Sequence, residues 1–364
     1  MFQPSIYQER IRRLIEKFES GTTYLLSDPS QIHYFTGFEF LVPNEREAFL
    51  VCNATSVTVV HTSFAPITRL NFLEYLSGIS PTQLQQHLET ILKKHQSQRL
   101  LFDPKTLFVA EFEAIKHAVK NVTNSSITNT VNSDFISSIM SKKAPEEIEQ
   151  IARACTATID TYNEVKQHLA VGITELEVAQ LIETQLRNRA SKSLAFPTIV
   201  AFGPHTALPH HQPGDTKLAE NMPVLVDMGA RVTGYCADMT RTTWFGPNPS
   251  DTFKKIEAIV LEAYAIAYQT TQQHVKKTVR AKDVDSAART HIANQGFGDL
   301  FIHTTGHGLG LNIHESPSIS WTNTQELTAG MTITIEPGIY IAGELGYRYE
   351  NTVLLTAQGC ETLT

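Results

Sequence analysis

The chain has 364 residues, of which 41% are hydrophobic and 18% are charged, and its formal net charge is −7. This length allows two domains of ordinary size, and the acidic balance gives no support to a nucleic-acid partner, which would favour a basic face. The four cysteines include no CxxC pair, which argues against a disulfide framework and a structural zinc site. The sequence has neither a signal-peptide core nor an apolar run of about 18 residues, so we expect a soluble cytoplasmic protein without a membrane partner.

Helices and strands are expected to alternate in the first third of the chain. Apolar residues at helical spacing, followed by Gly21, predict a first helix over residues 5–20. Similar patterns and short apolar runs predict helices over 30–35, 81–95 and 109–120, and strands over 23–27, 48–52, 56–62, 99–103 and 122–130. This alternation predicts a small α/β domain over residues 1–133, connected to the rest by a short helix over 132–143.

Residues 134–364 have the pattern of a second domain, in which helices and β-ribbons occur in pairs. Pro145, followed by two glutamates, is a favourable helix start and predicts a helix that ends near residue 168. Thr174 and Glu177 have the spacing of a capping box and predict a helix that ends near residue 190. We also expect helices over 250–275 and 281–294, strands over 197–202 and 222–243, and a β-rich segment over 302–355. The repeated pairing suggests an internal pseudo-repeat.

The segment from Met222 to Thr243 predicts two β-strands joined by a short turn, with Asp227 on the first strand and Asp238 on the second. The apolar run before Asp227 predicts a buried environment, where a carboxylate raises the cost of folding unless a partner compensates it. If the ribbon folds back on itself, the two carboxylates approach each other, and their repulsion requires a cation between them. A divalent metal, or a pair of them, is the simplest cation to expect.

Three later segments add side chains of the types that bind metals. His307 lies among glycines, and Glu336 ends an alternating strand. Glu350 is expected to share one strand face with Arg348, two residues earlier. With the two aspartates, these residues make four carboxylates and one imidazole, which cannot share a buried site without more than one positive charge. The set points to two divalent ions with a bridging water, and its carboxylate-rich character favours Mn²⁺, with Co²⁺ and Zn²⁺ as alternatives.

Four motifs carry a resemblance to a known family: VDMGARVTGYCADMTRT, TGHGLGLNIHE, ITIEPGIY and YRYENTVLLT. They resemble the motifs of the pita-bread-fold metallopeptidases, in particular the Xaa-Pro dipeptidases (prolidases) and aminopeptidase P. The resemblance covers nearly the whole chain and is weaker near the N-terminus, where YFTGF is similar to the family's YLTGF. It implies an α+β protein with a creatinase-like α/β domain over residues 1–133 and a pita-bread catalytic domain over residues 134–364.

The resemblance also implies an activity and a role for each candidate residue. The activity is hydrolysis of the peptide bond before a proline in second position, by a hydroxide that bridges two metal ions. Glu336 is the candidate that takes the proton of the nucleophile and passes it to the leaving prolyl nitrogen. The implied metal ligands are Asp227, Asp238, His307, Glu336 and Glu350, of which Asp238 and Glu350 bridge both ions.

Two further histidines are implied near the metals, and they correspond to His210 and His314. We expect them to hold substrate or to stabilise the oxyanion, and we prefer His210 over its neighbour His211. His303 either lines the proline pocket or is a buried structural imidazole. Arg348 either binds the substrate carboxylate or pairs with a ligand carboxylate, and we prefer the second interpretation.

Three more residues are expected close to the site or in the core beside it. Cys236 shares a strand face with Asp238 and lies either near the metals or, as we prefer, in the core. Tyr235 and Phe202 are candidates for apolar walls of the site.

Several alternative functions share this pattern. Ser318 stands where some dipeptidases of the family carry a basic residue, which weakens the case for a dipeptidase against aminopeptidase P, an enzyme that accepts longer peptides. Methionine aminopeptidase shares the fold, but the extra N-terminal domain and the HHQPGD segment argue against it. Creatinase-type chemistry needs no metals, and a catalytically dead binding module usually loses ligands, whereas all five are retained here. The leading hypothesis is an Xaa-Pro dipeptidase, expected from the resemblance to be a homodimer.

Overall fold

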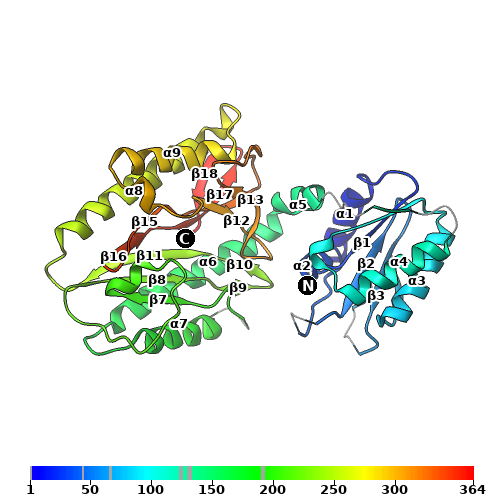
Figure 1. Cartoon of the computed structure of the whole chain (residues 1–364), viewed down its shortest axis with the longest axis horizontal. Coiled ribbons are helices and arrows are strands. Elements are labelled where there is room, and N and C mark those ends of the chain that lie inside the picture. The colour runs from blue at the N-terminus through cyan, green and yellow to red at the C-terminus, as the bar shows by residue number, and fades with distance from the viewer. Residues whose placement is uncertain (1, 43–44, 65–67, 123–125, 129–132, 190–192) are drawn as a thin grey trace. The chain divides into compact units, whose positions relative to one another are not determined.

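The computed structural model describes residues 2–42, 45–64, 68–122, 126–128, 133–189 and 193–364. The chain divides into two compact units, Met1–Met140 and Ser141–Thr364 (Figure 1). The expected domain boundary, after residue 133, falls at the start of helix α5 (Ser133–Ser141), and the two units divide at the end of this helix. Among the described residues, no helix combines the length and the apolar character that crossing a membrane requires.

The first unit is built on one mixed sheet of six strands in the order β4-β3-β2-β1-β5-β6. Strands β1, β2 and β3 pair antiparallel, whereas β4, β5 and β6 join the sheet in parallel. Helices α3 and α4 pack against each other, and their apolar faces bury the sheet residues Leu25, Phe49 and Phe102. The strands are β1 (Thr22–Leu26), β2 (Ala48–Cys52), β3 (Val57–His61), β4 (Glu74–Ser77), β5 (Arg99–Phe102) and β6 (Ser126–Thr128). The helices are α1 (Pro4–Ile15), α2 (Pro29–Thr36), α3 (Pro81–Lys94), α4 (Val109–Asn121) and the short 3₁₀-helix η1 (Pro104–Thr106).

The expected alternation of helices and strands in this unit is confirmed, with one strand missed. Strand β4 escaped sequence reasoning because it is a short edge strand whose residues are partly or fully exposed, so it has no apolar run. The strand expected over 122–130 is described only as β6 over Ser126–Thr128, and residues 123–125 and 129–130 lie outside the described residues.

Within its described residues, the second unit has four long helices around four small sheets (Figure 1). Helix α6 packs against α7, and helix α8 packs against α9. The helices are α6 (Pro145–Val165), α7 (Glu175–Arg189), α8 (Asp251–Gln272) and α9 (Ala281–Asn294), with 3₁₀-helices η2 (Lys166–His168), η3 (Gly203–Ala207), η4 (Gln273–Val275) and η5 (Gly298–Leu300). The sheets have the orders β11-β8-β7, β10-β9, β13-β12-β14-β17-β18 and β15-β16. Their strands are β7 (Ile199–Phe202), β8 (Met222–Met228), β9 (Arg231–Val232), β10 (Tyr235–Cys236), β11 (Met239–Phe245), β12 (Gly306–Gly308), β13 (Glu315–Ile319), β14 (Thr332–Ile335), β15 (Gly338–Ile341), β16 (Leu345–Arg348), β17 (Asn351–Thr356) and β18 (Gly359–Thr362).

Local sequence signals fix the start of helix α7. The expected capping box is confirmed: the Glu177 N–H donates to the Thr174 hydroxyl at 3.1 Å, and the Thr174 N–H donates to the Glu177 carboxylate at 2.8 Å. Glu175, the first residue of this helix, is completely buried. Burial of a carboxylate at this position brings its charge close to the positive end of the helix dipole.

The ribbon around the two aspartates is more complex than the expected pair of strands. Strands β8 and β11 pair with each other, with Asp227 opposite Thr240, but a second small hairpin, β9–β10, lies between them. Its turn residues Thr233 and Gly234 both have positive φ, which is the backbone of a tight two-residue hairpin. Asp238 therefore lies just before β11, next to the hairpin, and not within a strand.

The expectation that Arg348 and Glu350 share one face of a strand was wrong. Arg348 ends β16 and Glu350 precedes β17, so the two residues do not share one strand. Both side chains are nevertheless buried. The break between these strands lets the two segments pair with different partners, β16 with β15 and β17 with β14.

The close approach of strand β12 to its neighbour β14 gives a first testable prediction. A Cβ atom at Gly306 would lie 2.1 Å from the Thr334 carbonyl oxygen, which is backbone and cannot move away cheaply. We expect Gly306→Ala to lower the free energy of unfolding by about 1–3 kcal/mol, as overpacking of a core does, and denaturant unfolding measures this. Gly343→Asn is the matched control, because nothing lies within 4 Å of a Cβ there and asparagine tolerates positive φ. Equal stability of the two variants would contradict the prediction.

Candidate metal centre

One cavity in the second unit contains the expected metal ligands, the expected histidines and Arg348. Its volume is about 870 Å³. Its wall combines polar and ionisable side chains with apolar residues such as Phe196, Ile199 and Ile313. The expected site residues that line it are Asp227, Asp238, Glu336, Glu350, Arg348, His210, His303, His307 and His314.

The five candidate ligands come from strands of two different sheets. Asp227 lies near the end of β8, and Asp238 lies just before β11, which pairs with β8. His307 is the middle residue of β12, Glu336 directly follows β14, and Glu350 directly precedes β17. A hydrogen bond from the Glu350 N–H to the Thr240 carbonyl oxygen, at 3.2 Å, joins the two sheets next to the cavity.

Three of these side chains converge closely. Asp238, His307 and Glu350 each offer one ligand atom, and these atoms lie within 4.8 Å of one another. His307 Nε2 is 3.6 Å from an Asp238 oxygen and 3.3 Å from a Glu336 oxygen. His307 Nδ1 lies 3.0 Å from the Gly308 carbonyl oxygen, so Nε2 is the nitrogen that faces the carboxylates.

Three carboxylates in this cavity, those of Asp238, Glu336 and Glu350, resist ionisation. Burial, together with the charges of neighbouring carboxylates, raises the pKa of Asp238 and of Glu350 well above its usual value. Burial also raises the pKa of Glu336, although His303 and Arg348 oppose the shift. These directions follow from like charges held close together away from water.

Two carboxylate oxygens in the centre have no hydrogen-bond partner. They are Asp227 Oδ1 and Glu350 Oε1, and both are buried. A buried carboxylate oxygen without a partner is costly, and Arg348 is the only lysine or arginine among the described residues that line the cavity. Four acids, one imidazole and two free carboxylate oxygens therefore fit divalent metal ions as the missing partners.

Every nitrogen of the Arg348 guanidinium donates a hydrogen bond to another group of the protein. Its Nη2 donates to Asp227 Oδ2 at 2.6 Å, and its Nε donates to the Thr240 hydroxyl at 3.0 Å. Its Nη1 donates to the Tyr340 hydroxyl at 2.9 Å and to the Pro209 carbonyl oxygen at 3.3 Å. The guanidinium thus pairs with a candidate ligand carboxylate and fixes its orientation.

The histidines of the cavity have distinct environments. The His314 ring stands edge-on to the His307 ring with centroids 4.4 Å apart, and burial, followed by the His307 charge, lowers the pKa of His314. His303 Nε2 lies 2.8 Å from the Tyr340 hydroxyl, and burial lowers the pKa of His303. His210 is exposed, whereas Nε2 of its neighbour His211 is bonded to the buried Glu175 at 2.8 Å.

Some expectations about the walls were wrong. Phe202 and Tyr235 are completely or almost completely buried and are not among the described lining residues of the cavity. The Tyr235 hydroxyl donates to Glu147 at 3.0 Å, so this ring belongs to the packing against helix α6. The preferred interpretation of Cys236 as a core residue is confirmed: the side chain is fully buried, its thiol lies 3.6 Å from the Leu311 carbonyl oxygen, and burial raises its pKa to about 12.

Sequence reasoning missed three residues that organise the centre. Tyr340 joins His303 to Arg348 through its hydroxyl, and Thr240 donates to Glu350 at 2.6 Å. Both lie within motifs that carry the resemblance, so their position was a usable signal. Glu175 was assigned only to a helix start, and no local pattern marks its contacts with residues 30 or more positions away.

Comparisons with known proteins agree with this geometry. Residues 149–357 match the model of the metallopeptidase family M24, and residues 9–134 match that of the creatinase/prolidase N-terminal domain. An uncharacterized peptidase of Staphylococcus aureus (strain USA300) is 35% identical over 98% of both chains. The structure of an Xaa-Pro dipeptidase from Bacillus anthracis superimposes with a TM-score of 0.86 at 27% identity, over 98% of this chain and 97% of that chain. The X-Pro aminopeptidase from Thermotoga maritima gives a TM-score of 0.81 at 29% identity with the same coverage.

The matches extend over both units and agree with the expected fold, a creatinase-like N-terminal domain followed by a pita-bread domain. The family match also explains the carboxylate-rich cavity. Buried acids with unpartnered oxygens need a compensating cation, and a metallopeptidase binds one. The chain therefore belongs to the metallopeptidase family M24.

Proposed function

We propose that this metallopeptidase is an Xaa-Pro dipeptidase that works with two divalent ions, most favourably Mn²⁺. The observation that carries the proposal is the convergence of acidic side chains and His307 in one cavity where two carboxylate oxygens lack partners. The proposed ligands are Asp227, Asp238, His307, Glu336 and Glu350, with Asp238 and Glu350 shared between the ions. When bound, such ions lower the pKa of a coordinated water and polarise the scissile carbonyl.

Glu336 is proposed to carry the proton in this reaction. Its carboxylate accepts a hydrogen bond from the Thr334 hydroxyl at 3.2 Å and lies 3.3 Å from His307 Nε2. In the metal-free protein, burial raises the pKa of this carboxylate. A prolyl nitrogen leaves as a secondary amine and needs a proton, which Glu336 can supply in the second half of the reaction.

His314, His210 and His303 are proposed to position the substrate. His314 is half-exposed and stands next to His307, where a neutral imidazole can donate to a developing oxyanion. His303 is held by Tyr340 and by the Thr304 carbonyl oxygen, so its ring forms a fixed wall of the cavity. Arg348 is proposed to act through Asp227, whose orientation it fixes, and not by contact with substrate.

Aminopeptidase P activity on longer peptides is the second candidate. Ser318 lines the cavity at a position where a basic residue would bind the carboxylate of a dipeptide, and Arg348 has no nitrogen left for that purpose. A catalytically dead binding module is the third candidate, and the complete ligand set speaks against it. The homodimer and the cytoplasmic location stay predictions of the sequence.

One assay separates these candidates. The chain is dialysed against a chelator, reloaded with Mn²⁺ and tested on Leu-Pro and on Arg-Pro-Pro. A dipeptidase releases proline from Leu-Pro with the higher kcat/KM, aminopeptidase P prefers Arg-Pro-Pro, and a binding module releases nothing and holds almost no metal.

In Asp238→Asn we expect turnover to fall by more than about 10²-fold. Mutation of a residue that only hydrogen-bonds to a metal ligand already lowers metal affinity or activity by about 10–100-fold, and Asp238 is proposed to be a ligand itself. The control Asp160→Asn changes an exposed aspartate of helix α6 and should leave turnover unchanged.

Metal removal should make the stability of the protein sensitive to pH. The folded chain holds protons on Asp238 and Glu350 more tightly than the unfolded chain does, because their pKa values are raised above 3.8 and 4.5. The metal-free protein should therefore lose stability as pH rises above these values, by up to about 1.4 kcal/mol per pH unit for each retained proton. Denaturant unfolding with and without Mn²⁺ measures this. Asp238→Asn should show a shallower slope, and a metal-free protein that gains stability from pH 5 to pH 7 would contradict the ligand assignment.

Removal of the His314 imidazole should slow the chemical step. We expect His314→Ala to lower kcat by roughly 10²–10⁴ with a smaller change in KM, because the lost group acts mainly in the transition state. Steady-state kinetics on the better of the two substrates measures this. His168→Ala is the control, since His168 is exposed and bonds only to the Glu164 carbonyl oxygen of its own helical turn among the described contacts. An unchanged kcat in His314→Ala would rule out the proposed role.

A further inference from the structure

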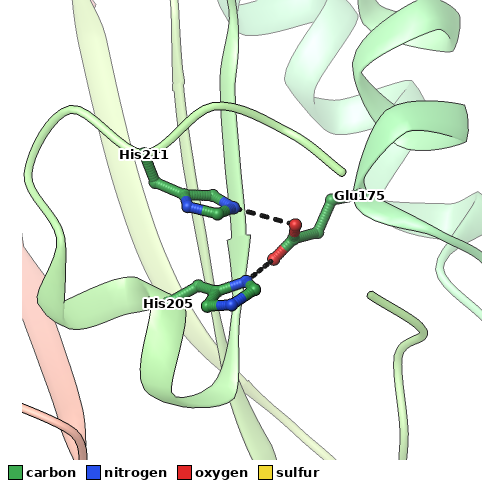
Figure 2. Close-up of side chains that lie close together, drawn as sticks. All are labelled: Glu175, His205 and His211. Atoms are coloured by element: carbon green, nitrogen blue, oxygen red, sulfur yellow. Dashed lines mark hydrogen bonds and ion pairs between the residues drawn. The ribbon is translucent and has the colours of Figure 1, made fainter. Parts of the chain in front are cut away.

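A second group of metal-binding side chains lies beside the candidate centre, and one of its members, His211, also lines the cavity. Figure 2 shows Glu175 at the start of α7 with two imidazoles pointing at its carboxylate. His205 Nδ1 lies 2.8 Å from Glu175 Oε1, and His211 Nε2 lies 2.8 Å from Glu175 Oε2. His205 belongs to η3 and His211 to the loop before β8, so one short segment supplies both rings.

The two imidazoles approach each other as well as the carboxylate. Their ring centroids are 4.3 Å apart at an interplanar angle of 32°. Each of the three residues offers one ligand atom, and the three atoms all lie within 4.8 Å of one another. Three donors of two chemical types that converge in this way form one face of a coordination sphere.

The carboxylate is fixed and charged before any ligand arrives. Glu175 is completely buried, and it also accepts hydrogen bonds from the Phe202 N–H at 2.8 Å and the Gly214 N–H at 3.1 Å. Burial by itself would raise the pKa of Glu175, but the hydrogen bonds from the histidines and from the backbone lower it below its usual value. Each oxygen therefore has one backbone donor that holds it in place and one histidine nitrogen in front of it.

We propose that Glu175, His205 and His211 bind a divalent transition metal ion of the zinc class, at a site separate from the carboxylate-rich centre. Two imidazoles and one carboxylate leave a fourth position for water. The side chain of His205 is 37% exposed, so this position opens to solvent. Bonds of about 2.0–2.1 Å in a tetrahedron set ligand atoms roughly 3.3 Å apart, which is close to the 2.8 Å that separates each imidazole nitrogen from its Glu175 oxygen.

The two sites differ in the metals that their donors prefer. The centre around Asp238 has four carboxylates and one imidazole, which suits a hard ion such as Mn²⁺. The Glu175 site has two imidazoles and one carboxylate, which suits Zn²⁺, Co²⁺ or Ni²⁺. The same chain can therefore hold both kinds of ion at once.

Metal at the Glu175 site would strengthen one wall of the cavity. The segment that carries both histidines also carries Pro209 and His210, which line the cavity. A metal would tie this segment to the start of α7 more tightly than two hydrogen bonds do. This consequence rests on the proposed function, whereas the binding of the metal does not.

The test is a zinc titration of the full-length, Mn²⁺-loaded protein. Calorimetry follows binding, and elemental analysis after gel filtration measures both metals. We expect the wild type to keep about one more equivalent of zinc than His205→Ala, with the same manganese content in the two proteins. Zinc-edge absorption spectra should show two imidazole ligands. The control His168→Ala changes an exposed histidine and should bind zinc as the wild type does.

Two further variants keep the outcomes separate. Glu350→Gln damages the carboxylate-rich centre, so the extra zinc should persist in this variant and disappear when His205→Ala is added. If His205→Ala binds as much zinc as the wild type, the proposal is overturned, and Glu175 is only a hydrogen-bond acceptor that anchors the segment. Loss of the extra zinc in Glu350→Gln alone would also overturn it, because the ion would then belong to the other centre. Peptidase assays of the Mn²⁺-loaded wild type test the proposed function independently of either result.

Discussion

The structure of the second unit depends on the repulsion between acids that are buried in one cavity. Asp238, Glu336 and Glu350 all have raised pKa values there, and one guanidinium, that of Arg348, partly offsets their charge. Burying like charges together is energetically costly, and the cost is offset only where a cation compensates the charges. Much of the surrounding design follows from this constraint: Arg348 orients Asp227, the Thr240 hydroxyl satisfies one oxygen of Glu350, and the Tyr340 hydroxyl holds the guanidinium.

The starts of helices and the positions of most strands could be predicted from the sequence, because the residues that determine them are neighbours in the chain. The capping box at Thr174 and the proline at the start of α6 mark helix ends with residues that lie within one turn. Strand β4 and the hairpin β9–β10 were not accessible in the same way. The first is an exposed edge without apolar alternation, and the second depends on a turn in which Thr233 takes a conformation that its side chain disfavours.

The candidate metal ligands could be predicted from sequence motifs, but the residues that hydrogen-bond to them could not. Five ligand-type residues stand in segments whose residue order resembles a known family, and the structure gathers all five in one cavity. The contacts of Arg348, in contrast, connect it to Asp227 and Pro209, more than a hundred positions away in the sequence. The cluster around Glu175 has the same character, since a single glutamate at a helix start gives no local sign of two histidines that fold back onto it.

The order in which the candidate ligands occur along the chain has a consequence for folding. Asp227 and Glu350 come from distant segments, and a hydrogen bond between Glu350 and Thr240 joins them only when both sheets are formed. Such non-local closures are slow and are completed late, because the entropy of the intervening chain must be lost first. Metal affinity of the proposed carboxylate-rich centre should therefore arise in one cooperative step near the end of folding, and a nascent chain would stay unable to capture metal at this centre until the segment with Glu350 has been synthesised.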